Sequence, residues 1–294
     1  MASKHQFSDI RIPIEPDNIA IMRHEELCIK CGKCKAVCTN EVSVGGHYDL
    51  GKSNDMAICV NCGQCANHCP VNSITERYHY QEIKKEIAAG DKIVVFETSP
   101  SIRVAIGEMF GYKPGTYMEN KMVAAIRRLG ADYVFDTTFG ADLTITEEAS
   151  ELVDRLVNKS GPFPMFTSCC PAWVKFAEIY YPEILPNIST SKSPISMQGP
   201  TIKTYFSKKI GIDPHKILSI SIAPCTAKKY EMDRPEKNSA GNYWLDASIR
   251  DIDYVITTRE LGAWIKEDGI DFAALSGEEY DSLMGQGSGA GIIF

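Results

Sequence analysis

The sequence predicts an α+β domain at the N-terminus, followed by an α/β domain with mostly parallel strands. Two observations support this prediction. Eight of the eleven cysteines lie between residues 28 and 69, in two runs with the same spacing, which is an internal repeat. Beyond residue 90, short apolar runs alternate with amphipathic segments, as strands and helices do in βαβ units. The 294 residues suffice for about two domains, and we expect these to span residues 1–90 and 91–294.

The expected elements follow from the apolar runs and from helix-capping residues. Residues 75–90 predict a polar helical connector that ends at Gly90. Strands are expected over residues 93–96, 133–135, 217–222 and 255–256. Helices are expected over residues 100–109, 122–129, 144–157, 197–209 and 259–266, with another through Trp173 and Phe176. Glu147 and Glu148 would lie in the first turn of the helix over 144–157, where acidic side chains are favoured.

Charge and hydropathy argue against several classes of protein. Acidic residues outnumber basic ones, 38 to 31, and the net charge of −7 argues against nucleic acid binding, which rewards a basic surface. The sequence contains no run of 18 apolar residues, so a membrane span is not expected. The first 16 residues lack the apolar stretch of a secretory signal. We therefore expect a cytoplasmic protein, unless a partner subunit carries an export signal. An odd number of cysteines in a reducing compartment favours metal binding or catalysis over disulfides.

The two cysteine runs have the spacing of a bacterial ferredoxin-like module that binds two [4Fe–4S] clusters. Each run reads C-x2-C-x2-C-x3-C, the first from Cys28 to Cys38 and the second from Cys59 to Cys69. Three thiolates of such a run face one cubane, and the fourth reaches the other. The expected ligand sets are therefore Cys28, Cys31, Cys34 and Cys69 for one cluster, and Cys38, Cys59, Cys62 and Cys65 for the other. The alternative is a pair of structural zinc sites, which usually take two separated pairs of ligands each.

Three further cysteines, Cys169, Cys170 and Cys225, lie in the second domain. Cys169 and Cys170 are adjacent at an expected strand-to-helix junction, and helix N-termini favour thiolates. Cys225 follows an apolar strand, and in α/β sheets ligands gather beyond the carboxyl ends of strands. The three thiols could meet there. The alternative is that they are ordinary buried core residues, as free cysteines commonly are.

Several separated segments resemble the signatures of [FeFe]-hydrogenases, the iron-only hydrogenases. Residues 167–173 (TSCCPAW) are similar to the first signature and residues 224–231 (PCTAKKYE) to the second. The resemblance extends to residues 193–194, to residues 202–205 (IKTY), and to residues 141–145 (ADLTI) with the two glutamates that follow. It runs in the order of the family from about Cys28 to Phe294. The chain is thus identified as resembling a catalytic subunit with a ferredoxin-like N-terminal domain.

The resemblance implies reversible proton reduction and hydrogen oxidation at an H-cluster. This cofactor is a [4Fe–4S] cubane joined to a two-iron unit with CO, cyanide and a bridging dithiolate. Cys170 and Cys225 match ligands of the cubane, and Cys169 matches the thiol that passes protons. Lys228 matches the lysine that hydrogen-bonds a cyanide, and Ser193 a serine near the cluster ligands.

The resemblance also implies a proton route and partners. Glu148, Glu151, Ser189 and Glu231 match the carboxylates and hydroxyl of the route, although Glu148 and Glu151, three residues apart, could instead form a solvated helix face. Electrons would pass through the two N-terminal clusters to a ferredoxin or another iron–sulfur subunit. A formate dehydrogenase or a nicotinamide-linked complex could contain that subunit. Maturation proteins would install the H-cluster, and neither nucleic acid nor membrane is expected as a partner.

The sequence departs from the family pattern in two respects. Ala223 and Ile195 stand where many catalytic members carry methionine and glutamine. No cysteine follows Cys225, whereas the third signature of the family supplies two more, beyond a segment resembling residues 287–294 (GSGAGIIF). We expect a hydrogenase truncated before that signature. The alternatives are a second polypeptide that supplies the missing cysteines, or a non-catalytic relative that acts in sensing or cluster assembly.

Overall fold

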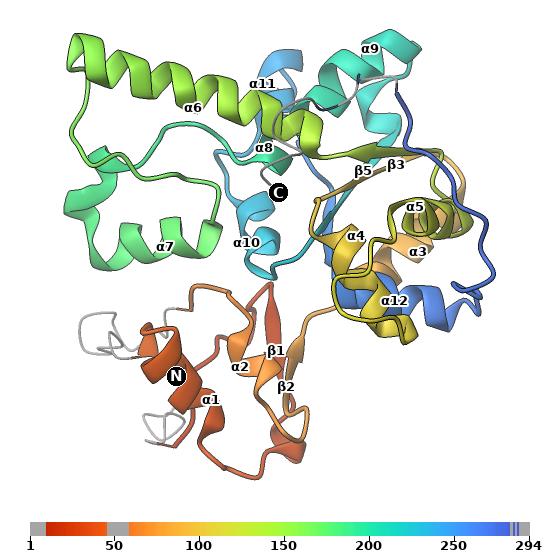
Figure 1. The fold of residues 1–294 in the computed structure, drawn as a ribbon, viewed down its shortest axis with the longest axis horizontal. Helices are drawn as coiled ribbons and strands as arrows, with labels where there is room; N and C mark the ends of the chain where they lie inside the picture. The colour runs from red at the N-terminus through yellow and green to blue at the C-terminus, as the bar shows by residue number, and fades with distance from the viewer. Residues whose placement is uncertain (1–9, 46–58, 283–284, 286, 288–294) are drawn as a thin grey trace. The chain divides into compact units, whose positions relative to one another are not determined.

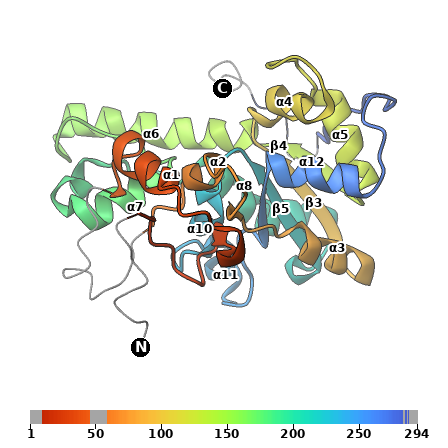
Figure 2. The same cartoon turned by 90° about the horizontal axis from the view of Figure 1, so that it is seen from below.

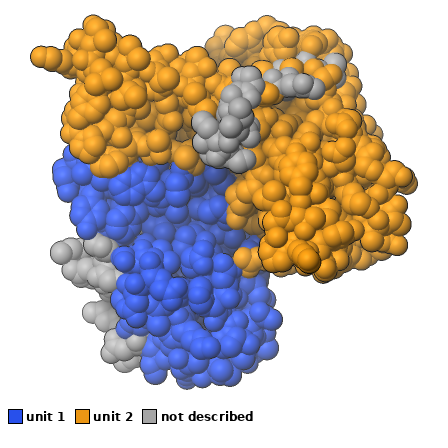
Figure 3. Space-filling view, in the orientation of Figure 1, with its two compact units in different colours: residues 1–77, 170–186, 225–230 blue, residues 78–169, 187–224, 231–294 orange. Residues whose placement is uncertain are grey.

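The computed structural model describes residues 10–45, 59–282, 285 and 287, and the chain divides into two compact units (Figure 3). Unit 1 consists of residues 1–77 together with residues 170–186 and 225–230. Unit 2 consists of residues 78–169, 187–224 and 231–294. This division differs from a single boundary at residue 90, because two segments from the second half of the chain pack with the cysteine repeat.

Unit 1 is built around the cysteine repeat. Strands β1 (Ile21–Arg23) and β2 (Ile74–Glu76) flank the repeat and pair antiparallel, with Ile21 opposite Glu76. The short helices α1 (Lys33–Ala36) and α2 (Gln64–Asn67) each carry the third cysteine of a run. A small core of Ile12, Ala20, Ile21, Val37, Cys65 and Ile74 lies between them. Helix α7 (Pro171–Tyr180) and the start of α10 (Ala227–Asp233) complete the unit.

Unit 2 contains a parallel four-stranded sheet, which confirms the α/β prediction. Its strands are β3 (Ile93–Thr98), β4 (Tyr133–Asp136), β5 (Ile217–Ala223) and β6 (Tyr254–Thr257). Their order is β4-β3-β5-β6, and every neighbouring pair is parallel. Figure 1 shows β3 and β5 side by side. All seven residues of β5 are buried, as expected for a strand covered on both faces. The strand order reverses between β3 and β5, which is where ligands bind in such sheets.

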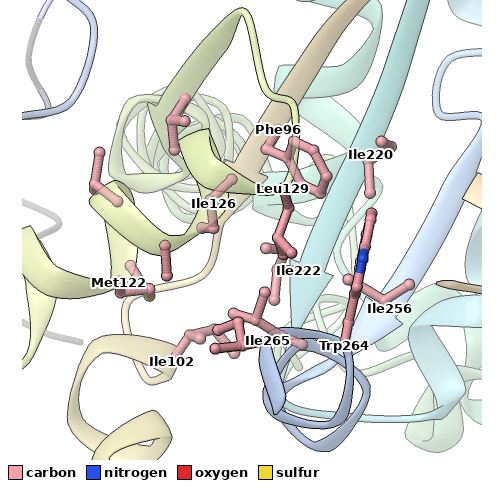
Figure 4. Packing of buried hydrophobic residues seen from close by; sticks show 14 of the residues in the cluster. Phe96, Ile102, Met122, Ile126, Leu129, Ile220, Ile222, Ile256, Trp264 and Ile265 are labelled. Carbon is pink, nitrogen blue, oxygen red and sulfur yellow. The ribbon is translucent and has the colours of Figure 1, made fainter. Parts of the chain in front are cut away.

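Helices cover both faces of this sheet. On one face, α3 (Tyr80–Ala89), α4 (Ile102–Ala105), α5 (Glu119–Arg128) and α12 (Thr258–Glu267) enclose the larger core. Figure 4 shows Met122, Ile126 and Trp264 from these helices packed against Phe96, Ile220 and Ile222 of the strands. On the other face, Ile202 and Phe206 pack against Val95 and Phe135. The helices α9 (Ser207–Ile210) and α11 (Ser239–Trp244) complete the unit.

Several expected helices have different bounds in the structure: α5 begins at Glu119 and not at Met122, and the largest differences lie in α6 and in two broken helices. Helix α6, the long helix in Figure 2, spans Thr138–Asn158 and not 144–157. Glu147 and Glu148 therefore lie beyond its first turn. Its early start depends on tertiary packing: a Cβ on Gly140 would lie 2.3 Å from the carbonyl oxygen of Pro194, so only glycine lets α6 approach α8 (Pro194–Thr201) this closely. Packing here outweighs the low helix propensity of glycine.

The other two differences lie in broken helices. The segment expected over 100–109 forms α4 and then a 3-10 turn, Ile106–Phe110. The segment expected over 197–209 begins earlier, at Pro194, and widens into a π-turn at Ile202–Phe206 before α9. Pro200 has no N–H to donate within α8, which favours such an irregular turn. Residues 75–76 belong to β2, while α3 ends at Gly90 in the left-handed conformation, as expected.

Candidate metal centres

The structure brings the eight cysteines of the repeat together in two sets of four. Cys28, Cys31, Cys34 and Cys69 line one cavity, and we name them the first cysteine set. Cys38, Cys59, Cys62 and Cys65 line a second cavity, and we name them the second cysteine set. These are the sets derived from the spacing; their role as cluster ligands stays a prediction.

Zinc and a [4Fe–4S] cluster make different demands on four cysteines. A mononuclear zinc ion holds each sulfur about 2.3 Å from the metal, whereas a cubane is larger and holds its four thiolates further apart. Among the described residues, no three side chains of His, Cys, Asp or Glu converge on a single point. Four thiols around one cavity are the donor set that a [4Fe–4S] cluster takes.

The two cysteine loops repeat the same backbone conformation. Lys30 and Gly32 in the first loop, and Asn61 and Gly63 in the second, all have positive φ, between 54° and 78°. Each glycine then caps the short helix that carries the third cysteine. Left-handed residues at these positions fold the chain tightly around the cavity. In the second loop this fold lets the backbone N–H of Asn61 donate to Sγ of Cys59 at 3.3 Å.

The surroundings of the two sets differ in charge. Four basic residues line the first cavity, namely Arg11, Arg23, Lys30 and Lys33. Among the described residues, no charged side chain lines the second cavity, where Ile12, Ile14, Val42 and Val60 surround the cysteines. Glu15 lies close by and accepts a hydrogen bond from the backbone N–H of Cys59 at 3.2 Å. Burial raises the pKa of the Cys59 thiol to about 12 and that of Cys38 to about 11. Metal binding at the second set must therefore displace protons from its thiols.

Two of the remaining cysteines lie in unit 1, near the second cysteine set. Cys170 is the exposed N-cap of α7, and Cys225 is partly buried just before α10. Burial raises the pKa of the Cys225 thiol, and the neighbouring thiolates of Cys170 and Cys62 raise it further. The ammonium of Lys228, in the first turn of α10, lowers the pKa of Cys225. Three thiols from distant parts of the sequence thus share one environment.

Asn61 forms hydrogen bonds that connect residues 170–186 and 225–230 to the cysteine repeat. Its carbonyl oxygen accepts a hydrogen bond from Thr226 Oγ1 at 2.6 Å. Its side-chain oxygen accepts one from Lys175 Nζ, on α7, at 2.8 Å. The same ammonium lies 4.0 Å from the ring centroid of Tyr230, a cation–π contact. Asn61 is buried, so both bonds are shielded from water and hold the segments in place.

The contact beside Asn61 yields a first prediction. A Cβ on Gly63 would lie 2.7 Å from Thr226 Oγ1, whereas one on Gly32 would meet nothing nearer than 3.5 Å. Both glycines have a left-handed φ, which costs an alanine roughly 1–2 kcal/mol. We expect Gly63→Ala to lower the thermal midpoint and the iron content more than the matched control Gly32→Ala, because only Gly63→Ala adds a clash. Equal losses in the two variants would argue against this contact.

In unit 2, the structure joins Glu151 to Ser189. Ser189 Oγ donates to Glu151 Oε2 at 2.9 Å, and the backbone N–H of Thr190 donates to the same oxygen at 2.9 Å. The buried Arg155 donates to the other oxygen at 2.6 Å and to the carbonyl oxygens of Pro162 and Ile188. Burial opposes ionisation of Glu151, but the hydrogen bonds from Arg155, Thr190 and Ser189 outweigh it and lower the pKa. Glu151 is therefore an ionised residue held by a network.

A second pair of expected site residues, Ser193 and Glu231, also meets in unit 2. Ser193 is the N-cap of α8, and its hydroxyl donates to Glu231 Oε1. Ser196 Oγ donates to the same oxygen at 2.7 Å. Glu231 is buried and lies 4.0 Å from Lys237 Nζ. Ser196 and Arg155 were not among the site residues predicted from the sequence. Arg155 could have been predicted, because it follows Glu151 by four residues, a spacing typical of helical ion pairs.

The other expected site residues stand apart from these pairs. Glu148 is partly buried on α6, and its Oε1 has no hydrogen-bond partner among the described residues. Cys169 is partly buried and belongs to unit 2, although Cys170 belongs to unit 1. Most of the segment 287–294, which resembles the stretch before the third signature, lies outside the described residues.

The cysteine sets and the parallel sheet together define an iron–sulfur protein with a ferredoxin-like unit and an α/β unit. Residues 54–75 match the 4Fe-4S binding domain, and residues 92–294 match the C-terminal domain of the iron-only hydrogenase large subunit. The chain belongs to this hydrogenase family.

Individual relatives agree with this assignment. The chain is 41% identical to the NADP-reducing hydrogenase subunit HndD of Solidesulfovibrio fructosivorans, over 94% of this chain and 49% of the relative. The structure of apo [FeFe]-hydrogenase HydA1 from Chlamydomonas reinhardtii matches with a TM-score of 0.66 and 44% identity, over 73% of this chain and 53% of that chain. Cytosolic iron-sulfur assembly component 3 of Bos taurus is 32% identical over 83% of this chain and 52% of the relative. The chain spans about half the length of these relatives.

Helix length and composition decide whether a helix could cross a membrane. Among the residues that the structure describes, no helix combines the length and the apolar character that crossing a bilayer requires.

Proposed function

We propose that this protein takes part in reversible hydrogen oxidation and proton reduction at an H-cluster, with electrons relayed through two [4Fe–4S] clusters. The observation that carries the proposal is the shared environment of Cys170, Cys225 and Cys62 in unit 1. It gives two thiols, drawn from two family signatures, a place beside the second cysteine set. An electron relay that ends at a catalytic centre requires such proximity.

The cysteines would hold the metal groups. The first and second cysteine sets would each bind one [4Fe–4S] cluster, and Cys170 and Cys225 would supply two thiolates to the cubane of the H-cluster. When bound, the H-cluster supplies the iron centre at which hydrogen is formed or split. Lys228 places an ammonium near Cys225, which suits an anionic group such as a cyanide ligand. Ser193 would lie near the same ligands.

The proton route would begin at Cys169, because a thiol is a weak acid that can donate and regain a proton. Glu148 has a carboxylate oxygen without a partner among the described residues, so it is able to accept a proton there. Ser189 and Glu151 are already joined by a hydrogen bond of 2.9 Å, which suits a further step toward solvent. Glu231, buried between two serine hydroxyls, would contribute a carboxylate to the same route.

The proposed setting is a cytoplasmic redox complex. The name of the relative HndD describes a subunit of an NADP-reducing hydrogenase, which supports a partner that exchanges electrons with this chain. That partner would be a ferredoxin or another iron–sulfur subunit, within a nicotinamide-linked complex or with a formate dehydrogenase. Maturation proteins would deliver the two-iron unit.

The second candidate is a non-catalytic iron–sulfur protein of the sensor or cluster-assembly type. Ala223 and Ile195, the two departures from the family pattern, pack together in one apolar cluster with Ile252 and Val255. A glutamine at position 195 would need a polar partner in that cluster. The similarity to the assembly component of Bos taurus also favours this candidate, although at 32% identity it is weaker than the 41% to HndD.

Infrared spectroscopy separates the two candidates. We expect anaerobically matured protein to show CO and cyanide bands together with hydrogen turnover, because only the H-cluster carries those ligands. Iron determination on the same sample tests the two N-terminal clusters independently. Cluster iron without those bands and without turnover, in protein that has been through maturation, would favour the non-catalytic candidate.

A further inference from the structure

Two opposite charges lie beside the second cysteine set, just outside its apolar cavity. Glu15, in the N-terminal segment, accepts the backbone N–H of Cys59, and Lys175 lies on α7. Burial is the main cause of the raised pKa of the Cys59 thiol; the charge of Glu15 raises this pKa further, and the charge of Lys175 lowers it. Both side chains belong to partly buried residues, so water screens their charges less than it screens those on the surface.

A series of side-chain hydrogen bonds connects these two charges, and we name it the Glu15–Lys175 chain. Lys175 Nζ donates to Asn61 Oδ1 at 2.8 Å, and Asn61 Nδ2 donates to Asn18 Oδ1 at 3.1 Å. Asn18 Nδ2 in turn donates to Glu15 Oε2 at 3.1 Å. Every donor points from the ammonium toward the carboxylate. The two ends come from residues 170–186 and 1–77, so only the assembled unit 1 forms the chain.

The groups around the two amides fix their orientation. Asn18 Oδ1 also accepts the backbone N–H groups of Ala20 and Ile21, each at 3.0 Å, so this atom must be the amide oxygen. Asn61 Oδ1 faces the ammonium of Lys175, which can only donate. Both asparagines are buried. The chain therefore has one arrangement of hydrogen bonds and holds its two charged ends in fixed positions.

The same chain encloses a proposed cluster ligand. The backbone N–H of Asn61 donates to Cys59 Sγ at 3.3 Å, while the N–H of Cys59 donates to Glu15 Oε1 at 3.2 Å. Hydrogen bonds and the backbone of residues 59–61 thus form a closed ring. On its other side, the ammonium of Lys175 lies 4.0 Å from the ring centroid of Tyr230. Lys175 is therefore held by residues from all three segments of unit 1.

The two charges have opposite effects on a cluster bound by the second cysteine set. Reduction adds one electron and changes no bond, so the reduced cluster carries one more negative charge than the oxidised one. Burial among apolar side chains disfavours that added charge and lowers the reduction potential. A nearby cation stabilises the reduced form and raises the potential, whereas a nearby anion lowers it. Lys175 thus offsets burial, and Glu15 adds to its effect.

We propose that Lys175 and Glu15 together set the reduction potential of the second cluster, with Lys175 raising it and Glu15 lowering it. Lys175 lies on the helix whose N-cap is Cys170, a proposed ligand of the next cubane. The segment that supplies this ligand therefore also supplies the charge that favours arrival of an electron at the second cluster. The inference rests on the proposed function, because it requires a cluster at the second cysteine set.

The test is a redox titration of the anaerobic protein, followed by electron paramagnetic resonance. Cys31→Ser and Cys62→Ser assign the signals of the first and second clusters. The variant Lys175→Gln keeps an N–H donor for Asn61 but removes the charge. We expect the equilibrium constant for reduction of the second cluster to fall about tenfold, which is about 59 mV for one electron. Lys175→Arg keeps the charge and should keep the wild-type potential.

Glu15→Gln provides an independent measurement with the opposite sign. It removes the anion and should raise the potential of the second cluster. The double variant Glu15→Gln/Lys175→Gln should lie between the two single variants. Damage to the fold would instead expose the cluster to water in both single variants and shift both potentials in one direction. Shifts of the same sign, or wild-type potentials in both single variants, would overturn the inference. If one variant loses the cluster, the sign of the shift in the other still decides.

Lys33 provides the matched control, since it lies in unit 1 and lines the first cavity. Lys33→Gln removes the same charge as Lys175→Gln and should shift the second cluster less. An equal shift of the second cluster would refute a local effect of Lys175. Iron determination and the number of cluster signals in the wild-type protein separate the two levels of the argument. Absence of the second cluster there contradicts the proposed function, whereas a bound cluster with unshifted potentials in the variants contradicts this inference alone.

Discussion

Replacing Cys169 by serine is expected to leave the iron content unchanged and to lower hydrogen turnover about a hundredfold or more. Under the proposed function this thiol passes protons and binds no iron. Positioned acid–base groups contribute about 10² to 10⁴ to a rate, and a serine hydroxyl is too weak an acid to replace the thiol. The measurements are iron per chain and hydrogen evolution with a chemical reductant. Turnover at the wild-type rate in this variant would refute the proton role.

The adjacent cysteine provides the matched comparison. Cys170 is the N-cap of α7 and shares its environment with Cys225 and Cys62, whereas Cys169 belongs to unit 2. We therefore expect Cys170→Ala, and likewise Cys225→Ala, to lower the iron content as well as turnover. Of these two neighbouring residues, only Cys170 is expected to affect the iron content. Full iron occupancy in Cys170→Ala would argue against ligation by this residue.

The variant Arg155→Met is expected to lower the free energy of unfolding by about 3–5 kcal/mol, the usual cost of removing one partner of a buried ion pair. The Arg155 side chain is only 6% exposed and holds Glu151 and two carbonyl oxygens. The control is Arg250→Met, which breaks an ion pair with Asp233 whose side chains are 48% and 56% exposed. That pair should contribute about 1 kcal/mol or less. Similar losses in both variants would contradict the assigned role of Arg155.

The loss of stability caused by Arg155→Met should become smaller as the pH falls. The folded state lowers the pKa of Glu151, so the ionised carboxylate stabilises the fold above its unfolded pKa of about 4.3. This contribution is lost as the pH falls through the lowered folded pKa. In Arg155→Met the buried charge is uncompensated at neutral pH and is neutralised in acid. The difference in stability between the two proteins should therefore narrow below about pH 4.3.

Local spacing was sufficient to group the cysteines but not to define the units. The reach of a short loop is limited, so three cysteines at intervals of three residues must face one cavity, as Cys59, Cys62 and Cys65 do. Apolar runs likewise predicted the parallel sheet, because a strand buried on both faces has few alternatives. No local pattern indicated that residues 170–186 and 225–230 pack with the repeat. Their placement depends on contacts such as Thr226 with Asn61, between residues far apart in sequence.

The candidate site shows the same limit. The adjacent thiols and Lys228 were recognisable from motifs, because the chemistry of each residue is local. Only part of the hydrogen-bond network around Glu151 was predictable. Arg155 is close to Glu151 in sequence, but Ser189 is distant, and its contact with Glu151 depends on how the intervening chain folds. The start of α6 was misplaced for a related reason: Gly140 is a poor helix former that the close approach of α8 makes necessary.

The composition of unit 1 has a consequence for biogenesis. Because its three segments end at residue 230, the ribosome must synthesise more than two thirds of these 294 residues before the unit is complete. Domains otherwise tend to fold as soon as they emerge, N-terminal first. Until α7 and the start of α10 arrive, the side of the nascent repeat that contains Asn61 remains uncovered. The Asn61 side of the second cysteine set is therefore covered only after residues 170–186 and 225–230 have been translated.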